Sequence, residues 1–238
     1  MPPIKVKMLD SGDGSGSGDV AAGARSKAPR KPRQKPLTRI QREKQDVILE
    51  AALDVFSEKG FLGATIDQIA EAAGMSKPNL LYYFPRKEEI YKRLMTSMLD
   101  IWLQPLRELD SVGDPVPEIR SYIRRKLEMS RDFPRQSRLF AGEMLQGGPR
   151  IVDVLEGDLK ALVDEKAKVL EGWMESGKLR RTDPYHLIFA IWATTQHYAD
   201  FDVQVRAVLG KDRGGEGRFE DAARFLETLF MHGVLRQG

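Results

Sequence analysis

The chain has no cysteine among its 238 residues. Disulfides, thiolate-ligated metal sites and cysteine nucleophiles are therefore excluded. It also lacks any apolar run approaching the roughly 20 residues that a membrane-spanning helix needs. No apolar segment follows the first charges of the N-terminus, so we expect no signal peptide. These absences favour a cytoplasmic protein that has no membrane partner.

Catalytic motifs are also scarce. The three histidines, His186, His197 and His232, are scattered, and His197 with Asp200 is an ordinary pair of helical neighbours three positions apart. The chain has no HExxH motif, no glycine-rich phosphate loop and no serine-nucleophile motif. We therefore expect a protein that is not an enzyme, with no catalytic residue, no metal and no cofactor.

The charge is unevenly distributed. Residues 1–40 hold nine Lys or Arg against three Asp, a net charge of +6, so the remaining 198 residues carry −3 of the total of +3. Prolines interrupt the basic residues from Arg25 to Arg39, and residues 10–24 are rich in glycine and serine. Such a segment is too polar to fold alone, so we predict a disordered basic tail at 1–40. It is either a solubilising tail or an arm that follows DNA phosphates.

Beyond the tail, the sequence predicts an all-α fold. Apolar positions recur with helical spacing from Gln41 onwards, Gly60 closes the first helix, and no segment alternates with a period of two. Proline and glycine separate the later periodic segments. These predict helices at about 86–109, bent at Pro105, and at 115–132, 135–146, 149–176, 184–209 and 217–236.

Residues 65–83 have the pattern of two short helices joined by a tight turn. The first helix carries an apolar stripe at Ile66, Ile69, Ala70 and Ala73. Thr65 stands before it and Gln68 three positions later, as in a capping box. Gly74 follows, where a positive φ is needed, and Ser76 can cap a second helix with Pro78 in its first turn. This is a helix-turn-helix, whose second helix suits the DNA major groove.

Polar side chains cluster at the starts of these helices. Thr65 and Ser76 stand at N-termini that favour a phosphate, and asparagine can pair with adenine. The predicted DNA-binding residues are Thr65, Ser76, Lys77, Pro78, Asn79, Tyr82, Tyr83 and Lys87. Residues 41–84 hold only four basic residues against seven acids, so binding must depend on local placement of charge. The alternative is that these are surface residues of a small helical bundle.

The run from Gly74 to Glu88, GMSKPNLLYYFPRKE, resembles the signature of TetR-type repressors, and residues 51–61 resemble the first helix of that family. Pro78, Leu81 and Arg86 depart from it, because glycine, tyrosine and serine are usual there. The resemblance implies an N-terminal three-helix head and a C-terminal helical domain that binds an effector and dimerises. We accordingly predict a DNA-binding domain at 41–88 and an effector-binding and dimerisation domain at 89–238.

The segment 191–201 is a candidate effector site. Trp192, Thr195 and Gln196 lie within about one helical turn and offer an indole, a hydroxyl and an amide, as a flat polar ring needs. Trp102 could add a second aromatic wall. The alternative is that Trp192 belongs to the core and that Gln196 and His197 are interface or solvent residues.

Residues 99–106, 126–134, 157–166 and 183–201 resemble the TetR-type regulators of pyrimidine utilisation, whose effectors are uracil and thymine. That resemblance implies an effector site at Trp102, Lys126, Trp192, Gln196 and Tyr198. Two alternatives remain, a TetR-type repressor with a different small aromatic or apolar effector and a DNA-binding protein without an effector.

The last two predicted helices each carry an apolar stripe, which includes Ile188 and Ile191 in one and Phe225 and Leu229 in the other. They could pack only within their own domain or form part of a four-helix bundle with a second subunit. Because a helix-turn-helix protein that binds a palindrome normally works as a dimer, we expect a homodimer on double-stranded operator DNA.

Overall fold

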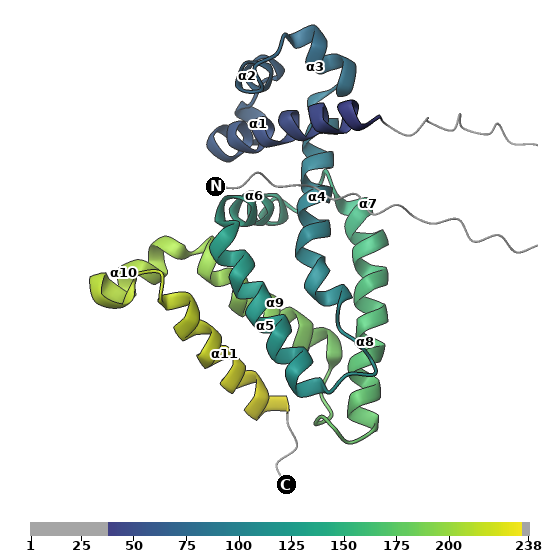
Figure 1. Cartoon of the computed structure of the whole chain (residues 1–238), viewed down its shortest axis with the longest axis vertical. Coiled ribbons are helices and arrows are strands. Elements are labelled where there is room, and N and C mark those ends of the chain that lie inside the picture. Colours follow the sequence, from purple (N-terminus) through teal and green to yellow (C-terminus); the bar gives the residue numbers. More distant parts are fainter. Residues whose placement is uncertain (1–37, 235–238) are drawn as a thin grey trace, which may run out of the picture.

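The computed structural model describes residues 38–234, and within them every regular element is a helix. A small head contains α1 (Arg39–Gly63), α2 (Ile66–Ala72) and α3 (Lys77–Tyr83). Figure 1 shows α4 (Lys87–Arg107) running from this head into a larger helical bundle. The predicted all-α fold with a helix-turn-helix head is confirmed. Most of the predicted tail lies outside the described residues, but residues 39 and 40 already belong to α1.

Local rules determine the ends of α1. Thr38 and Gln41 form a reciprocal capping box, which satisfies N–H groups that have no partner inside the helix. Gly60 has a φ of 67°, so the regular helix ends there and one further turn leads to Gly63. The interior face of α1 is apolar and includes Ile48, Leu53 and Phe56, all 1% exposed or less. This face packs against α2 and α4, which fixes the head on α4.

The bundle consists of α5 (Pro115–Asp132), α6 (Pro134–Leu145), α8 (Lys160–Glu175), α9 (Pro184–Asp200) and α11 (Arg218–Val234). Helix α5 packs against α9 and α11, and α8 packs against α9 and α4, as the two views show. Proline follows an aspartate N-cap at the start of both α5 and α9. No helix within residues 38–234 is long and apolar enough to cross a membrane.

Two predicted helices are interrupted. Instead of a single helix over 149–176, a short α7 (Val152–Val154) and a π-helical turn (Leu155–Leu159) precede α8. The helix predicted over 184–209 breaks at Phe201, whose backbone leaves the helical region, and α10 (Asp202–Arg213) follows. Helix α10 buries none of its residues, so no core packing holds it in line with α9. Asp202 instead pairs with Arg218 at the start of α11, at 2.6 Å.

Candidate functional site

Helices α2 and α3 form the predicted helix-turn-helix. The Thr65 hydroxyl accepts from the Gln68 N–H at 3.3 Å, and the Gln68 amide oxygen accepts from the Thr65 N–H at 3.0 Å. Gly74 has a φ of 63°, as the turn between the helices requires. Ile69 and Leu80 are completely buried and hold the two helices against α1. The outer face of α3 is thereby directed away from the core.

That outer face carries exposed polar and aromatic groups. Lys77, Pro78 and Asn79 are exposed in the first turn of α3, and Tyr82 is 70% exposed. The rings of Tyr82 and Tyr83 meet edge to face, with centroids 5.1 Å apart. Ser76 is the N-cap residue of α3, but its side chain makes no capping hydrogen bond, contrary to our prediction. Five of the eight predicted DNA-binding residues therefore lie within seven positions on one exposed surface.

Both lysines that we predicted to bind DNA have partners within the head. The Lys77 ammonium pairs with Asp67 at 2.9 Å, and both side chains are at least half exposed. Such an exposed pair is worth ~1 kcal/mol or less, so a phosphate can replace Asp67. The Lys87 ammonium donates to the carbonyl oxygens of Phe61 and Ala64, at 2.7 Å each. One of its three N–H groups remains for a further acceptor.

In the bundle, α5 and α9 bring a buried polar group together. Lys126 of α5 is only 4% exposed, and its ammonium forms no hydrogen bond or ion pair with any residue from 38 to 234. Burial lowers the pKa of this ammonium to about 8, and the nearby Asp200 carboxylate opposes that effect. The Ser130 hydroxyl donates to the Thr195 carbonyl at 2.9 Å across the same interface. Burial likewise raises the pKa of Asp200, which accepts from the Ser137 hydroxyl at 2.5 Å.

The other predicted effector residues lie in different surroundings. The Trp192 indole N–H donates to the Tyr122 hydroxyl at 2.5 Å, and Gln196 is half-buried one turn further along α9. Tyr198 packs near Phe219 of α11, with ring centroids 6.4 Å apart. Trp102 belongs to the core beneath the head and meets Phe140 edge to face. Lys126 and the α9 residues thus share one helix pair, whereas Trp102 belongs to a different buried cluster.

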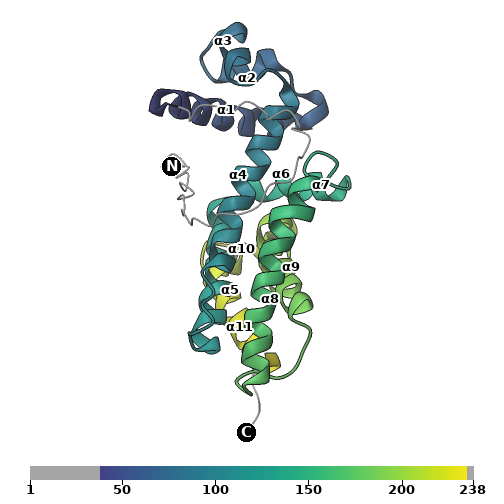
Figure 2. The same cartoon turned by 90° about the vertical axis from the view of Figure 1, so that its right-hand side faces the viewer.

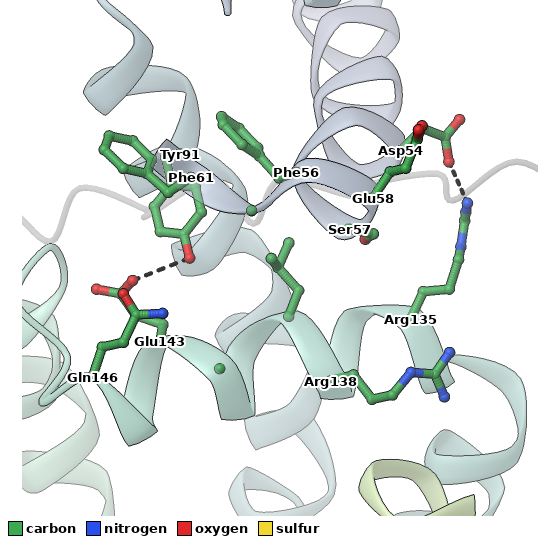
Figure 3. Close-up of a pocket in the computed structure, with 13 residues that line it drawn as sticks. Asp54, Phe56, Ser57, Glu58, Phe61, Tyr91, Arg135, Arg138, Glu143 and Gln146 are labelled. Atoms are coloured by element: carbon green, nitrogen blue, oxygen red, sulfur yellow. Dashed lines mark hydrogen bonds and ion pairs between the residues drawn. The ribbon is translucent and has the colours of Figure 1, made fainter. Parts of the chain in front are cut away.

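A cleft of about 680 Å³ lies between the head and α6, and none of the predicted effector residues lines it. Figure 3 shows its wall, where Arg135 of α6 reaches Asp54 of α1 and the Tyr91 hydroxyl donates to Glu143 at 3.1 Å. Glu143 is 1% exposed. We did not predict a role for Glu143 or Tyr91, because their burial arises from the packing of three helices that are distant in sequence.

An apolar surface remains exposed on α9 and α11. Phe189 is 46% exposed, Phe225 61% and Leu229 50%. Each of the two apolar stripes predicted from the sequence is therefore partly exposed and partly buried, since Ile188, Ile191 and Leu226 lie in the bundle core. Solvent-exposed aromatic and aliphatic side chains on two helices of one domain are typical of a surface that a partner covers.

A three-helix head with an exposed recognition helix, joined by one long helix to an all-α bundle, defines a DNA-binding regulator. Two family models match: the "Bacterial regulatory proteins, tetR family" model over residues 48–94 and the "YcdC-like protein, C-terminal region" model over residues 95–237. The chain belongs to the TetR family. It is a transcriptional regulator rather than an enzyme, and regulators of this family bind operator DNA and small effectors.

The chain is similar to the HTH-type transcriptional regulator RutR of Escherichia coli K12, with 52% identity over 191 residues that cover 80% of this chain and 90% of RutR. Among solved structures it is similar to the ketosteroid regulator KstR2 of Mycobacterium tuberculosis, with a TM-score of 0.62 at 21% identity over 85% and 98% of the two chains. It also resembles AibR in complex with isovaleryl coenzyme A and operator DNA, with a TM-score of 0.59 at 18% identity over 78% and 97%. These two structural likenesses support the fold.

Proposed function

We propose that the protein is a homodimeric repressor that binds a palindromic operator and is released from it by a pyrimidine base, uracil or thymine. The observation that carries the proposal is the buried Lys126 ammonium without a partner, on the helix pair that also holds Trp192 and Gln196. The 52% identity to RutR over both domains supports the same class of effector, since the family resemblance implies uracil and thymine. We assign DNA binding to residues 41–88 and effector binding and dimerisation to 89–238.

The chemistry of the site favours a small ring that has hydrogen-bond acceptors. An isolated buried ammonium is costly unless an acceptor pairs with it. A ring carbonyl next to Lys126 would supply that acceptor, and the Gln196 amide offers both a donor and an acceptor to the remaining ring edge. Since the indole N–H of Trp192 already binds Tyr122, Trp192 would contribute its aromatic face. Tyr198 would serve as an outer wall, whereas Trp102 lies in the core beneath the head and does not join this group.

Effector binding would release the protein from DNA by shifting the population between two states of the dimer, which differ in the spacing of their two DNA-binding heads. An effector that binds the DNA-incompetent spacing better lowers operator affinity by the differential, typically about 1–3 kcal/mol. We propose a cytoplasmic location, because a repressor must reach an operator on chromosomal DNA. The alternatives are a different small aromatic or apolar effector and a protein without an effector. A thermal-shift screen of nucleobases would separate them, because no stabilisation by any base would favour the last.

The recognition helix gives the first testable prediction. Lys77→Ala and Tyr82→Ala should each weaken operator binding by about 1–3 kcal/mol, because each removes a group that contacts phosphate or base. Neither variant should lose thermal stability, since both side chains are half exposed or more. Fluorescence anisotropy with labelled operator measures the effect, and Lys168→Ala on the exposed surface of α8 is the control. Unchanged affinity in both head variants would refute the assignment of α3.

The basic tail gives the second prediction. Deleting residues 1–36 should flatten the dependence of operator affinity on salt, because each phosphate neutralised adds about 0.9 to the slope of log K against log salt. The deletion leaves Thr38, which caps α1, in place. Anisotropy titrations between low and physiological salt measure both slopes. Equal slopes for the two proteins would leave the tail with a solubilising role only.

A further inference from the structure

A buried carboxylate lies where α6 approaches the head. The Glu143 side chain is fully buried, and three donors surround it. The Arg150 guanidinium donates at 2.8 Å, the Arg150 backbone N–H at 3.0 Å and the Tyr91 hydroxyl at 3.1 Å. Burial, followed by the negative charge of Glu143, raises the pKa of Tyr91, so its hydroxyl stays a donor at neutral pH. A buried carboxylate with this many donors is held in one position.

Arg150 connects the fixed Glu143 carboxylate to the head. Its guanidinium lies over the ring of Phe61, 3.9 Å from the centroid, and Phe61 is in the last turn of α1. The Lys87 ammonium, at the start of α4, also lies near that ring, 4.5 Å from the centroid. Stacking of a guanidinium on an aromatic face is directional and contributes more when it is partly removed from water, as for Arg150. Phe61 is therefore in contact with cations from both α4 and the segment that follows α6.

The opposite end of α6 reaches the polar groups next to Lys126. Ser137, near the start of α6, donates to Asp200 of α9, and Asp200 interacts electrostatically with Lys126. Arg135 at the same end pairs with Asp54 and Glu50 of α1, but all three side chains are about half exposed. Helix α6 thus has a solvent-exposed ionic contact with the head at one end. At the other end, the buried Glu143–Arg150 pair reaches the head through the Phe61 ring.

We propose that Arg150 is the positioning residue of the DNA-binding head, which it holds by linking buried Glu143 of α6 to the Phe61 ring of α1. A displacement of α6 moves Glu143 and Arg150 and so changes the orientation of the head. This bridge of Glu143, Arg150 and Phe61 deepens the proposed function, on which it rests for the role of the head in binding DNA. The exposed contacts of Arg135 contribute little to head orientation, since they are readily exchanged for water.

The first test requires no effector. Because the chain has no cysteine, Glu71→Cys on α2 and Lys168→Cys on α8 allow spin labels at two exposed positions. Labelled protein is diluted with unlabelled protein, so that the distances measured by pulsed electron resonance lie within one protomer. We expect one narrow distribution, which broadens and shifts in Arg150→Ala and in Phe61→Leu. Phe61→Leu leaves the Glu143–Arg150 pair intact, so it decides the outcome if Arg150→Ala fails to fold.

Arg135→Ala is the matched control, since it removes the exposed ionic contact at the other end of α6. Its distribution should stay narrow, and Arg150→Lys, which keeps the charge but loses the planar group, should give intermediate broadening. Narrow distributions in Arg150→Ala and Phe61→Leu would overturn the proposal, as would equal broadening in Arg135→Ala. Failure here would leave the pyrimidine assignment intact, because no ligand is used.

The second test uses operator and uracil. In Arg150→Ala the ratio of operator affinities without and with saturating uracil should fall towards 1, while calorimetry still detects uracil binding. If Arg150 had only a structural role, its substitution would lower the unfolding temperature and leave the ratio of operator affinities unchanged. That result would refute the positioning role. If the wild-type protein did not bind uracil, that result would instead count against the proposed function.

Discussion

Lys126→Met should abolish most of the uracil binding and at the same time make the protein more stable. The Lys126 side chain is only 4% exposed, and burial lowers the pKa of its ammonium from 10.5 to about 8. A lowering of this size means that the buried charge reduces the stability of the folded protein by about 3 kcal/mol. An apolar side chain of similar length removes this cost, whereas the ring carbonyl of an effector loses a charged donor, which is worth about 1.5–3 kcal/mol.

The stability gain should depend on pH in a defined direction. Below pH 8 the lysine is protonated in both the folded and the unfolded state, so the cost is present in full. Between pH 8 and 10.5 the unfolded state binds more protons, and wild-type stability rises with pH. The difference between variant and wild type should therefore be largest at pH 7 and shrink up to pH 10.5. Denaturant unfolding at several pH values, with calorimetric titration of uracil at pH 7, measures both effects.

Lys166 provides the matched control for Lys126. It is also buried, at 7% exposure, but its ammonium donates to the Leu109 carbonyl at 3.1 Å and pairs with Glu165 at 3.0 Å. Lys166→Met should thus lower stability, because it leaves a carbonyl without its donor, and should leave uracil binding unchanged. If Lys126→Met were destabilising and bound uracil normally, Lys126 would be an ordinary structural lysine and the effector site would lie elsewhere.

The double substitution Phe225→Glu and Leu229→Glu should produce a monomer that has lost operator binding. Both side chains are at least half exposed on α11, and Phe189 of α9 adds to the same class of exposed apolar groups. Placing two carboxylates in a buried interface is strongly unfavourable. A monomer then contacts one half-site at a time, so that operator affinity should fall by roughly 100-fold or more.

Sedimentation and anisotropy measure these two losses in one preparation. Val112→Glu is the control, because Val112 is 88% exposed in the loop between α4 and α5 and lies on neither α9 nor α11. The control should remain dimeric and bind operator like the wild type. A doubly substituted protein that is still dimeric would show that α11 faces solvent in the assembly and that the two subunits meet elsewhere.

The head was predictable from sequence because its determinants are local. The Thr65–Gln68 capping box and the positive φ of Gly74 depend on residues within one or two helical turns, and both are present. Ser76 failed as a capping side chain, although the backbone still begins a helix there. The break at Phe201 was not predictable, because α10 has the periodicity of a helix and differs only in what it fails to pack against.

The interior of the bundle was predictable only in part. Lys126 was predicted as an effector-binding residue because residues 126–134 resemble related regulators. Its burial without a partner follows from the packing of α5 on α9 and was not predictable. The bridge of Glu143, Arg150 and Phe61 was missed altogether. Arg150 directly follows Gly147, Gly148 and Pro149, a run that marks a turn. Nothing in that turn indicates that the arginine will lie over the Phe61 ring, 89 positions earlier.

The most direct test of the account is operator affinity with and without uracil. The operator is first selected from a randomised duplex library, and anisotropy then follows its release. We expect uracil and thymine to lower the affinity by about 5- to 150-fold, whereas cytosine and adenine should have no effect at the same concentration. Equal operator affinity in the presence and absence of saturating uracil and thymine would contradict the claim that a pyrimidine base controls this regulator.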